Sequence, residues 1–455
     1  MTHDLVIVGG GLAGLSAATR ATDFGLKPLI LERGSDERYP CNSRFAGGVL
    51  HLTMVDMRAS PKELLDTMLA ATAEKEASEF KKMFANEAAR SFEWLRSKGA
   101  KFVRAIPYRT LLAMAPPRPR IPGLAWYGRG PDLTLRKLTK HVLDAGGEIR
   151  RGVRAQDLIV EDGAVVGVRA RTAAGTEEFR GGAVVIADGG FQTDLDRVRK
   201  YISPAPEKLF QRGAATGAGD GIRMAEAVGA QLYGVDKFYG HLLGRECFHN
   251  DKLWPYPILD PLAAAGMVVD ANGKRFMDEG LGGVYMTNMV AALPDPLSTT
   301  VVFDETIWRE VGGSNANAPQ TNPWFVREGG TVIEAPDLKT LAAKIGVPAD
   351  ALEATVKTYN EAVMAGRTSD LNPPRTASVK LKPWPIKDAP FRAIQAAAGI
   401  TYTTGGIMID VDAQVVGESG KPIPGLFAAG AATGGSEGGP RAAYTGGLSK
   451  ALITG

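Results

Sequence analysis

The first 33 residues combine short apolar runs with a stretch of small side chains. Val6–Val8 and Leu29–Leu31 are unbroken apolar runs, and each predicts a buried β-strand. Between them, Ala13, Ala17 and Ala18 place small side chains on a predicted helix, which lets that helix pack close to a sheet. The pattern therefore predicts a strand, a glycine turn, a helix and a second strand.

Four later stretches also have a recognisable pattern. Residues 147–170 alternate apolar and polar positions around the hairpin turn "EDGA", which predicts a β-meander. Residues 337–366 have helical spacing interrupted by "GVPAD", which predicts two helices. Residues 372–390 predict an extended linker. Residues 235–257 are rich in aromatic and polar side chains and show no sheet periodicity.

Composition narrows the class of protein. With 455 residues, 44% of them apolar, the chain can bury a large core and is expected to form two domains. The 53 basic and 50 acidic residues are intermixed, which argues against a nucleic-acid partner. No stretch of about 18 apolar residues occurs, and the start lacks a charged region and a cleavage site. We therefore expect a cytoplasmic protein without a transmembrane segment.

The glycines after the first strand have the spacing of a dinucleotide-binding turn. Gly9, Gly11 and Gly14 form GxGxxG, which provides a tight turn, close approach to a pyrophosphate and close helix packing. Glu32 ends the second strand, where a carboxylate can accept hydrogen bonds from both ribose hydroxyls. Because strand, turn, helix, strand and acid occur in order, we predict dinucleotide binding.

Several blocks together resemble one flavoprotein family, that of fumarate reductases, succinate dehydrogenase flavoprotein subunits, tricarballylate dehydrogenase and 3-ketosteroid dehydrogenases. The tricarballylate and 3-ketosteroid dehydrogenase branch is the most similar. The blocks span nearly the whole chain and are "CNSRFAGG" (41–48), "VVIADGGF" (184–191), "TGAGDGIRMAEAVGA" (216–230), "YGH" (239–241), "ANGKRFMDEG" (271–280) and "IPGLFAAGAATGG" (423–435).

The resemblance implies an α/β fold, in which a Rossmann-like FAD-binding domain with a β-meander carries an inserted α+β cap. We place the FAD-binding domain at residues 1–235 and 385–455 and the cap, with the substrate beneath it, at 236–384. No second glycine fingerprint follows, and the two cysteines form no CxxC pair. We therefore expect no bound nicotinamide domain, no dithiol centre and an external electron acceptor.

The resemblance also implies which residues hold FAD, and no metal site is expected. The expected cofactor-binding residues are Gly9, Gly11, Leu12, Ala13, Gly14, Glu32, Arg33, Asn42, Ser43, Gly47, Gly48, Val153, Ala187, Asp188, Gly189, Asp220, Gly430, Ala431, Gly447, Leu448 and Ser449. Two of them depart from the family pattern: Asp188 replaces Ser or Thr, and Ala431 replaces a glutamate. Cys41 lies six residues before Gly47, where relatives attach FAD through histidine, but we expect non-covalent FAD.

Tyrosines stand where fumarate reductases have charged groups. The six residues that follow the "RFMDE" block, 280–285, contain no arginine and end with Tyr285. Tyr444 aligns with a carboxylate-binding arginine of the family, and Tyr402 with a histidine. A phenol can donate to an enolate oxygen or, as phenolate, remove an α-proton. His241 matches a family histidine, and Arg441 is a candidate for the lost carboxylate contact. For each tyrosine, packing with a satisfied hydroxyl is the alternative.

Two classes of function follow. The first is an FAD-dependent desaturase that forms a C=C bond next to a carbonyl or carboxylate of a small substrate, or an ene-reductase that runs the reverse reaction. The second is a non-catalytic electron-carrier flavoprotein. We further expect a helix to begin at Gly447 with its first N–H groups toward the flavin, and Tyr444 to face the substrate.

Overall fold

The computed structural model describes residues 3–106, 110–314 and 320–455. Its larger part is built on a six-stranded sheet in which the neighbours are parallel except for the antiparallel edge strand β19. In spatial order the strands are β19 (Gln414–Val416), β20 (Pro422–Ala428), β10 (Val184–Ile186), β1 (Leu5–Val8), β2 (Pro28–Glu32) and β6 (Glu148–Arg151).

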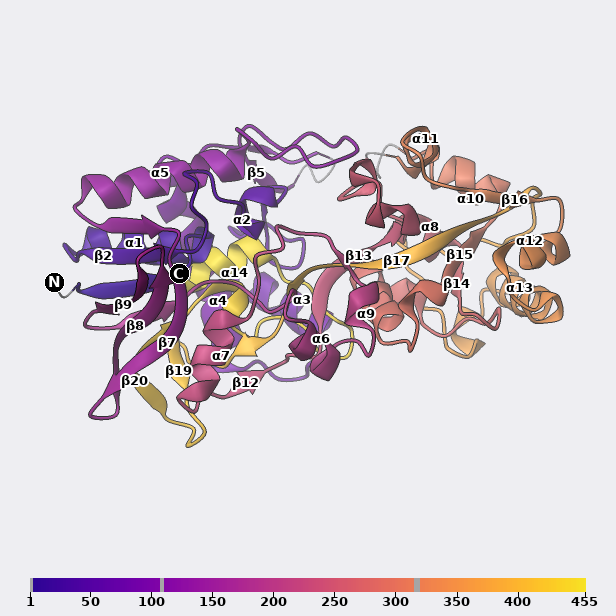
Figure 1. The fold of residues 1–455 in the computed structure, drawn as a ribbon. Helices are drawn as coiled ribbons and strands as arrows, with labels where there is room; N and C mark the ends of the chain where they lie inside the picture. Colours follow the sequence, from indigo (N-terminus) through magenta and orange to yellow (C-terminus); the bar gives the residue numbers. More distant parts are fainter. Residues whose placement is uncertain (1–2, 107–109, 315–319) are drawn as a thin grey trace.

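The apolar runs at the start of the chain form β1 and β2, as predicted. Both faces of these strands are buried: Val6 and Val8 lie in one core cluster, whereas Ile7 lies in another. A parallel strand covered on both sides needs no polar alternation, which explains the unbroken run. Helix α1 (Leu12–Asp23) packs beside α5 (Gly130–Asp144) and the C-terminal helix α14 (Gly447–Thr454), so segments far apart in the sequence lie side by side (Figure 1).

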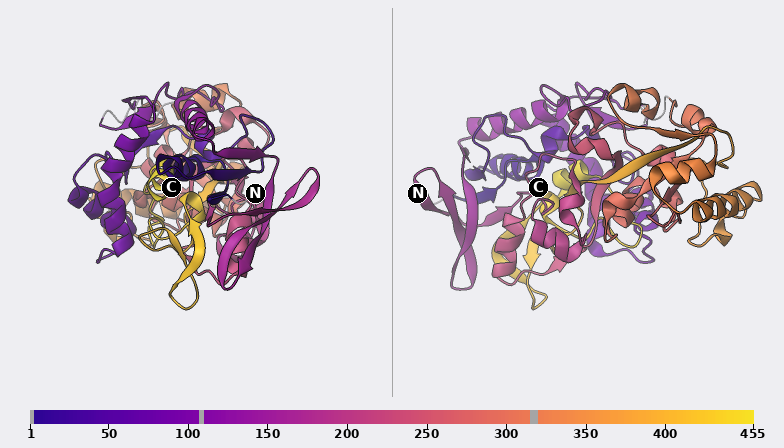
Figure 2. Two further views of the ribbon diagram at one scale, coloured as in Figure 1. Left: turned by 90° about the vertical axis from the view of Figure 1, so that its left-hand side faces the viewer. Right: turned by 45° about the vertical axis from the view of Figure 1, so that its right-hand side comes forward.

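The predicted β-meander is present with one correction. Strands β7 (Arg154–Glu161), β8 (Ala164–Thr172) and β9 (Gly175–Arg180) form it, and Asp162 and Gly163 turn the first hairpin with φ of 48° and 78°. Residues 148–151, which the sequence pattern assigned to the meander, instead form β6 beside β2. Figure 2 shows the meander, in purple, projecting from the molecule far from the orange helices of the cap.

The larger part contains further elements outside the six-stranded sheet and the meander. They are α2 (Asn42–Phe45), β3 (Val49–Leu50), α3 (Pro61–Thr72), α4 (Glu79–Ser97), β4 (Phe102–Arg104), β5 (Leu112–Met114), α6 (Leu195–Tyr201), α7 (Asp220–Ala227), β12 (Leu232–Tyr233) and β18 (Gly406–Ile407).

The cap is a mixed sheet with helices around it. Its strands are β11 (Phe210–Gln211), β13 (Phe238–Gly244), β14 (Met267–Val269), β15 (Thr300–Phe303), β16 (Ile333–Ala335) and β17 (Phe391–Thr403). Its helices are α8 (Asp260–Ala265), α9 (Gly283–Ala291), α10 (Glu305–Glu310), α11 (Thr321–Arg327), α12 (Leu338–Ile345) and α13 (Ala349–Met364). The last two confirm the predicted helix pair.

Strand β13 corrects the expectation that residues 235–257 lack sheet structure. It pairs antiparallel with β17, and its polar side chains Tyr239 and His241 alternate with the buried Phe238, Gly240 and Leu242. The alternation was missed because these polar side chains face an internal cavity instead of solvent.

Strand β17 runs from the cap into the larger part of the molecule, as Figure 1 shows. Its first half pairs with β15 and β16, and its second half with β13 and β11. The predicted domain limits near 235 and 385 stay a prediction, because this strand belongs to both regions. No helix within the described ranges is long and apolar enough to cross a membrane.

Candidate functional site

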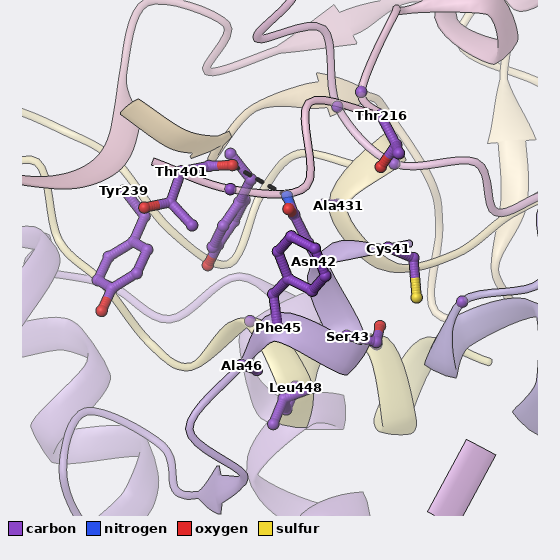
Figure 3. Close-up of a pocket in the computed structure, with 18 of the residues that line it drawn as sticks. Cys41, Asn42, Ser43, Phe45, Ala46, Thr216, Tyr239, Thr401, Ala431 and Leu448 are labelled. Atoms are coloured by element: carbon purple, nitrogen blue, oxygen red, sulfur yellow. Dashed lines mark hydrogen bonds between the residues drawn. The ribbon is translucent and has the colours of Figure 1, made fainter. Parts of the chain in front are cut away.

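A cavity of about 430 Å³ joins the carboxyl edge of the parallel sheet to the strands of the cap. The residues that follow β1, β2 and β10 line it on one side, and those of β13 and β17 line it on the other. In Figure 3, Cys41 and Thr216 lie on one side of the view, Tyr239 and Thr401 on the opposite side, and Asn42 between them. Ligands of open α/β sheets bind at such an edge.

The glycine turn after β1 has the geometry that the fingerprint predicts. Gly9 has a φ of 102°, and a Cβ at Gly14 would lie 2.0 Å from the Gly9 carbonyl oxygen. Glu32 supports the turn, because its carboxylate accepts hydrogen bonds from Gly10 N at 2.8 Å and Gly34 N at 2.7 Å. The carboxylate is held in place while it lines the cavity, where its remaining lone pairs can accept from a ligand.

The segment "CNSRFAGG" lies across the cavity and ties three regions together. Asn42 donates to Thr401 O at 2.9 Å and accepts from Ala214 N at 2.8 Å. Ser43 Oγ accepts from Leu12 N at 3.0 Å. Ser43 keeps its O–H and Asn42 keeps a second N–H as possible donors, so their role toward the cofactor stays a prediction. A Cβ at Gly47 would meet no atom within 4 Å, so this backbone faces open space.

Asp188, the departure in the "ADGG" block, lies at the end of β10. Its Oδ2 accepts from Gly221 N at 2.8 Å, whereas its buried Oδ1 has no partner. Burial raises the pKa of this carboxyl to about 7, and the nearby Asp220 adds to the effect. Asp220 itself forms a two-pronged ion pair with Arg154, at 2.8 and 2.9 Å.

Most of the expected cofactor residues line the cavity. They are Gly9, Gly11, Leu12, Ala13, Glu32, Arg33, Asn42, Ser43, Gly47, Gly48, Val153, Ala187, Asp188, Gly189, Asp220, Ala431, Gly447 and Leu448. Gly14, Gly430 and Ser449 are not in the lining. Gly14 packs under the turn, Gly430 packs against Ala13, and Ser449 Oγ accepts a hydrogen bond from His51 N at 3.0 Å.

Two expected catalytic residues lie outside the cavity, which corrects the sequence interpretation. Arg441 is exposed and donates to Ala70 O at 3.3 Å. The backbone changes direction between Arg441 and Tyr444, so that only Tyr444 reaches the cavity. Tyr285 packs against the cap core near Asp278, and its pKa is raised by burial and by that carboxylate. Its neighbour Val284 lines the cavity instead, since consecutive residues of α9 face different directions.

Tyr444 and Tyr402 lie together at the cap side of the cavity. Burial raises the pKa of both phenols well above 10, and the carboxylate of Glu437 contributes to both shifts. Tyr402 donates to Glu437 Oε1 at 2.9 Å, so its proton is committed to that buried carboxylate. The first N–H of α14, that of Gly447, donates to the hydroxyl oxygen of Tyr444 at 3.4 Å. Both phenols stay protonated, and Tyr444 is suited to donate.

The predicted helix at Gly447 is confirmed, and a buried ion pair holds its first turn. Glu437 Oε1 also accepts from Thr445 N at 3.1 Å and Gly446 N at 3.3 Å, and Oε2 lies 3.5 Å from Lys450 Nζ. Glu437 therefore connects Tyr402 to the chain that leads into the helix. Sequence reasoning gave Glu437 and Lys450 no role.

Tyr239 was also missed, although it lies in the recognised "YGH" block. Its ring stacks on that of Tyr444 with centroids 3.9 Å apart, and its hydroxyl lies 2.9 Å from His241 Nε2. His241 Nδ1 lies 2.5 Å from Asp260 Oδ2, and Asp260 Oδ1 accepts from Leu242 N at 2.9 Å. Since a carboxylate accepts, Nδ1 donates to it and Nε2 accepts from Tyr239. The period of two along β13 could have predicted Tyr239, but nothing in the sequence signals Asp260.

A β-bulge brings Thr401 and Tyr402 to the cavity together. Opposite β13, Tyr239 pairs with Tyr402 and Gly240 with Ile400, so Thr401 is an extra residue of β17. Consecutive strand residues normally point to opposite faces, but a bulge changes the direction of a side chain. Both residues line the cavity for this reason.

Besides Arg154, three arginines of the lining have no counterpart in the sequence prediction. Arg118 and Arg120 come from the proline-rich segment after β5, and Arg212 follows β11. They surround Tyr256 of the cap. Burial alone would raise the pKa of this phenol, but the three guanidinium groups hold it below its usual value.

The residues present fit FAD. The glycine turn and Glu32 form one end, Gly47 and Gly189 leave space where a side chain would intrude, and Asp188 presents an unpartnered oxygen. Burial raises the pKa of the Cys41 thiol to about 11, so the thiol stays protonated near neutral pH. A protonated thiol is a poor nucleophile, which agrees with the expectation of non-covalent FAD.

Comparisons with known proteins agree with this reading. The family described as "FAD binding domain" matches residues 4–445. The chain is 29% identical over 536 residues to the NADH:acrylate oxidoreductase of Vibrio harveyi, an alignment that covers 97% of this chain and 48% of the relative. It is 31% identical over 274 residues to the 4-oxocyclohexanecarboxylate 2-dehydrogenase of Sinomonas cyclohexanicum, covering 55% and 46%.

The fold is also known from solved structures. The 3-ketosteroid-Δ4-(5α)-dehydrogenase of Rhodococcus jostii RHA1 superimposes with a TM-score of 0.74 at 22% identity, covering 100% of this chain and 95% of that one. The chain spans about half the length of the NADH:acrylate and NADH:fumarate oxidoreductases that it matches. The resemblance to fumarate reductase-like flavoproteins, the fold class and the cofactor are thereby confirmed. The chain belongs to the FAD binding domain family.

Proposed function

We propose that this chain is an FAD-dependent dehydrogenase that forms a C=C bond next to the carbonyl of a small organic substrate. The observation that carries the proposal is the pairing of Tyr444, which stays protonated beside Gly447 N, with the Tyr239–His241–Asp260 chain in the same cavity. The first pair can hold a carbonyl oxygen, and the second can receive a proton. Relatives named as dehydrogenases and C=C reductases support this assignment.

The carbonyl oxygen of the substrate would bind to Tyr444 Oη, which would donate its proton to that oxygen in a hydrogen bond. The Gly447 N–H, which donates to Tyr444 Oη at 3.4 Å, brings the positive end of the α14 dipole to the same place. They would stabilise the enolate that develops as the α-proton leaves. The pKa of Tyr444 lies far above neutral because burial disfavours the phenolate, so its proton stays on the oxygen as charge builds.

The α-proton would go to Tyr239, which passes its own proton to His241 Nε2 at 2.9 Å. Asp260 holds the histidine in the accepting tautomer and stabilises the imidazolium that forms, as in a serine hydrolase triad. When bound, FAD supplies the acceptor for the hydride from the β-carbon. The substrate thus loses a proton and a hydride and gains one double bond.

Tyr402 would position the helix start rather than react. Its hydroxyl donates to Glu437, which in turn fixes Thr445 N and Gly446 N. These bonds would fix the backbone between Tyr444 and Gly447 and thereby the direction of the Tyr444 side chain. Loss of Tyr402 would therefore loosen the carbonyl site without removing a donor from it.

The reverse reaction uses the same groups, with Tyr239 returning a proton to the α-carbon. The names of the acrylate, fumarate and vinyl phenol reductases among the relatives favour this direction as the second candidate. Electrons would pass to or from an external carrier. A pure electron carrier would not require the Tyr239–His241–Asp260 arrangement, so we rank it last.

Anaerobic mixing of the holoenzyme with saturated cyclic ketones tests the proposal. We expect the oxidised flavin absorption to bleach and the ketone to lose two hydrogens by mass spectrometry. An α,β-unsaturated ketone should re-oxidise the reduced protein. Bleaching by a chemical reductant but by none of the ketones or carboxylated ketones would identify a carrier and defeat the dehydrogenase assignment.

A further inference from the structure

We infer that Arg118, Arg212 and Tyr256 form a carboxylate-binding subsite, so that the substrate is an oxo-acid, with a carbonyl and a carboxylate in one small molecule. This inference rests on the proposed function, because it places the second group of the same substrate. It differs from the sequence expectation, which gave a carboxylate contact to the exposed Arg441.

Each of the two arginines is fixed by neutral groups. Arg118 donates to Phe45 O at 2.5 Å, at the end of α2, and its guanidinium lies 5.4 Å from the centre of the Tyr256 ring. Arg212 donates to Thr401 Oγ1 and to Pro255 O, both at 3.0 Å. These contacts hold the guanidinium groups in the cavity wall but do not neutralise them.

Among the described residues, neither the half-buried Arg118 nor the buried Arg212 has a carboxylate within 4.0 Å, although two buried arginines elsewhere in the chain do. Arg44 pairs with Asp132, and Arg275 with Glu279. Arg212 is only 7% exposed, and its Nε has no hydrogen-bond partner. A buried guanidinium without a counter-charge is costly, and an anion in the cavity would remove that cost.

The two charges also act on each other and on Tyr256. Burial lowers the pKa of the Arg118 guanidinium, and repulsion from Arg212 adds to this effect. The same positive potential favours negative charge on the Tyr256 phenol. A substrate carboxylate would satisfy both guanidinium groups through charge-assisted hydrogen bonds, and Tyr256 would then stay a neutral donor beside it.

The subsite lies on the substrate side of the cavity. Its residues contact the end of α2, the cap residue Pro255 and β17, whereas the nucleotide side consists of the β1 turn, Glu32 and Asp220. Tyr239 lies close enough to Arg118 to affect the pKa of its guanidinium, and Tyr256 lies close enough to Tyr444 to affect the pKa of its phenol. The carbonyl site and the carboxylate site are therefore neighbours, which limits the substrate to a small molecule.

A matched pair of probes tests the subsite independently of turnover. Benzoate and benzamide have the same shape and differ in charge, and either can be titrated against the oxidised holoenzyme by its flavin absorption. We expect benzoate to bind at least 10-fold more tightly. Arg118→Gln and Arg212→Gln should each weaken benzoate by about 10- to 100-fold and leave benzamide unchanged. Arg118→Lys keeps the positive charge and should therefore weaken benzoate binding less than Arg118→Gln does.

The exposed cap arginine Arg327 provides the control, because Arg327→Gln removes a charge outside the cavity lining. Equal binding of benzoate by wild type and both glutamine variants would overturn the subsite, as would loss of bound FAD in Arg118→Gln. Oxo-acids and their methyl esters then separate the two proposals. Equal oxidation of acid and ester keeps the dehydrogenase and rejects the subsite. Arginine-dependent benzoate binding without any ketone oxidation keeps the anion site and rejects the dehydrogenase.

Discussion

The two sides of the cavity are built in opposite ways. The nucleotide side comes largely from residues 5–34, where a strand, a turn and a helix follow one another and Glu32 bonds back to Gly10. The substrate side brings together Tyr239 of β13, Tyr402 of β17 and Tyr444 near the C-terminus. The first side is specified by local sequence, whereas the second exists only once the cap sheet has formed against the C-terminal tail.

The two sides also differ in the charge of key polar side chains, which are carboxylates on the nucleotide side and protonated phenols on the substrate side. Glu32 and Asp220 remain near backbone N–H groups or an arginine, which suits hydrogen bonds to a cofactor. On the substrate side, phenols are buried and hold their protons, so they can donate without carrying charge. The contrast indicates that binding of the cofactor and chemistry on the substrate can be damaged separately.

The largest effect is expected from Tyr444→Phe. The variant loses the only donor of the carbonyl site that belongs to a side chain, and loss of one such donor typically costs 10²–10³ in turnover. Flavin reduction by a ketone substrate should slow by that factor in stopped-flow measurements, while FAD content stays at the wild-type level. Reduction at the wild-type rate would mean that Tyr444 only packs against Tyr239.

His241→Gln should slow the same step by about 10²-fold, within the usual range for general acid–base groups. Glutamine can still bond to Tyr239 but cannot take up a proton. The rate of the variant should therefore rise with pH as the Tyr239 phenol ionises directly, a dependence that a purely structural histidine would not produce. KM should change little, because His241 holds no part of the carbonyl site.

Glu32→Ala tests the nucleotide side of the cavity and should weaken FAD binding by about 10- to 100-fold. Each lost charge-assisted bond contributes about 1.5–3 kcal/mol, and part of this loss is offset by water. Equilibrium dialysis or fluorescence titration of FAD measures the affinity. With FAD in excess, the rate of flavin reduction should equal that of wild type; a large fall in this rate would show that the two sides are coupled.

A smaller, pH-dependent effect is expected from Asp188. Its pKa is about 7 in the folded chain against 3.8 ordinarily, so the folded state binds a proton that the unfolded chain releases. Stability should fall as the pH rises from about 4 to about 7, by up to about 1.4 kcal/mol per pH unit, and then level off. Asp188→Asn should flatten this slope in thermal melts of the FAD-free protein; an unchanged slope would exclude Asp188 as its source.

Local sequence was sufficient for the strands β1 and β2, the helix α1 and the helix pair α12 and α13. Local sequence also predicted most of the residues on the nucleotide side of the cavity, because GxGxxG and the acid at the end of β2 interact with neighbours within one βαβ unit. The resemblance to a known family extended this to FAD and to the tyrosines at 402 and 444. Residues 148–151 were assigned to the wrong sheet, since periodicity predicts a strand but not its partner.

Only the tertiary structure decided the chemistry of the substrate side. The bulge opposite Tyr239 brought Thr401 and Tyr402 to one cavity, and α8 placed Asp260 behind His241. Packing also left Arg441 in solvent and placed Arg118 and Arg212 in the cavity wall, where neither has an acidic partner among the described residues. The physical reason is that burial and proximity set the protonation and the direction of a side chain, and both depend on segments far apart in the sequence.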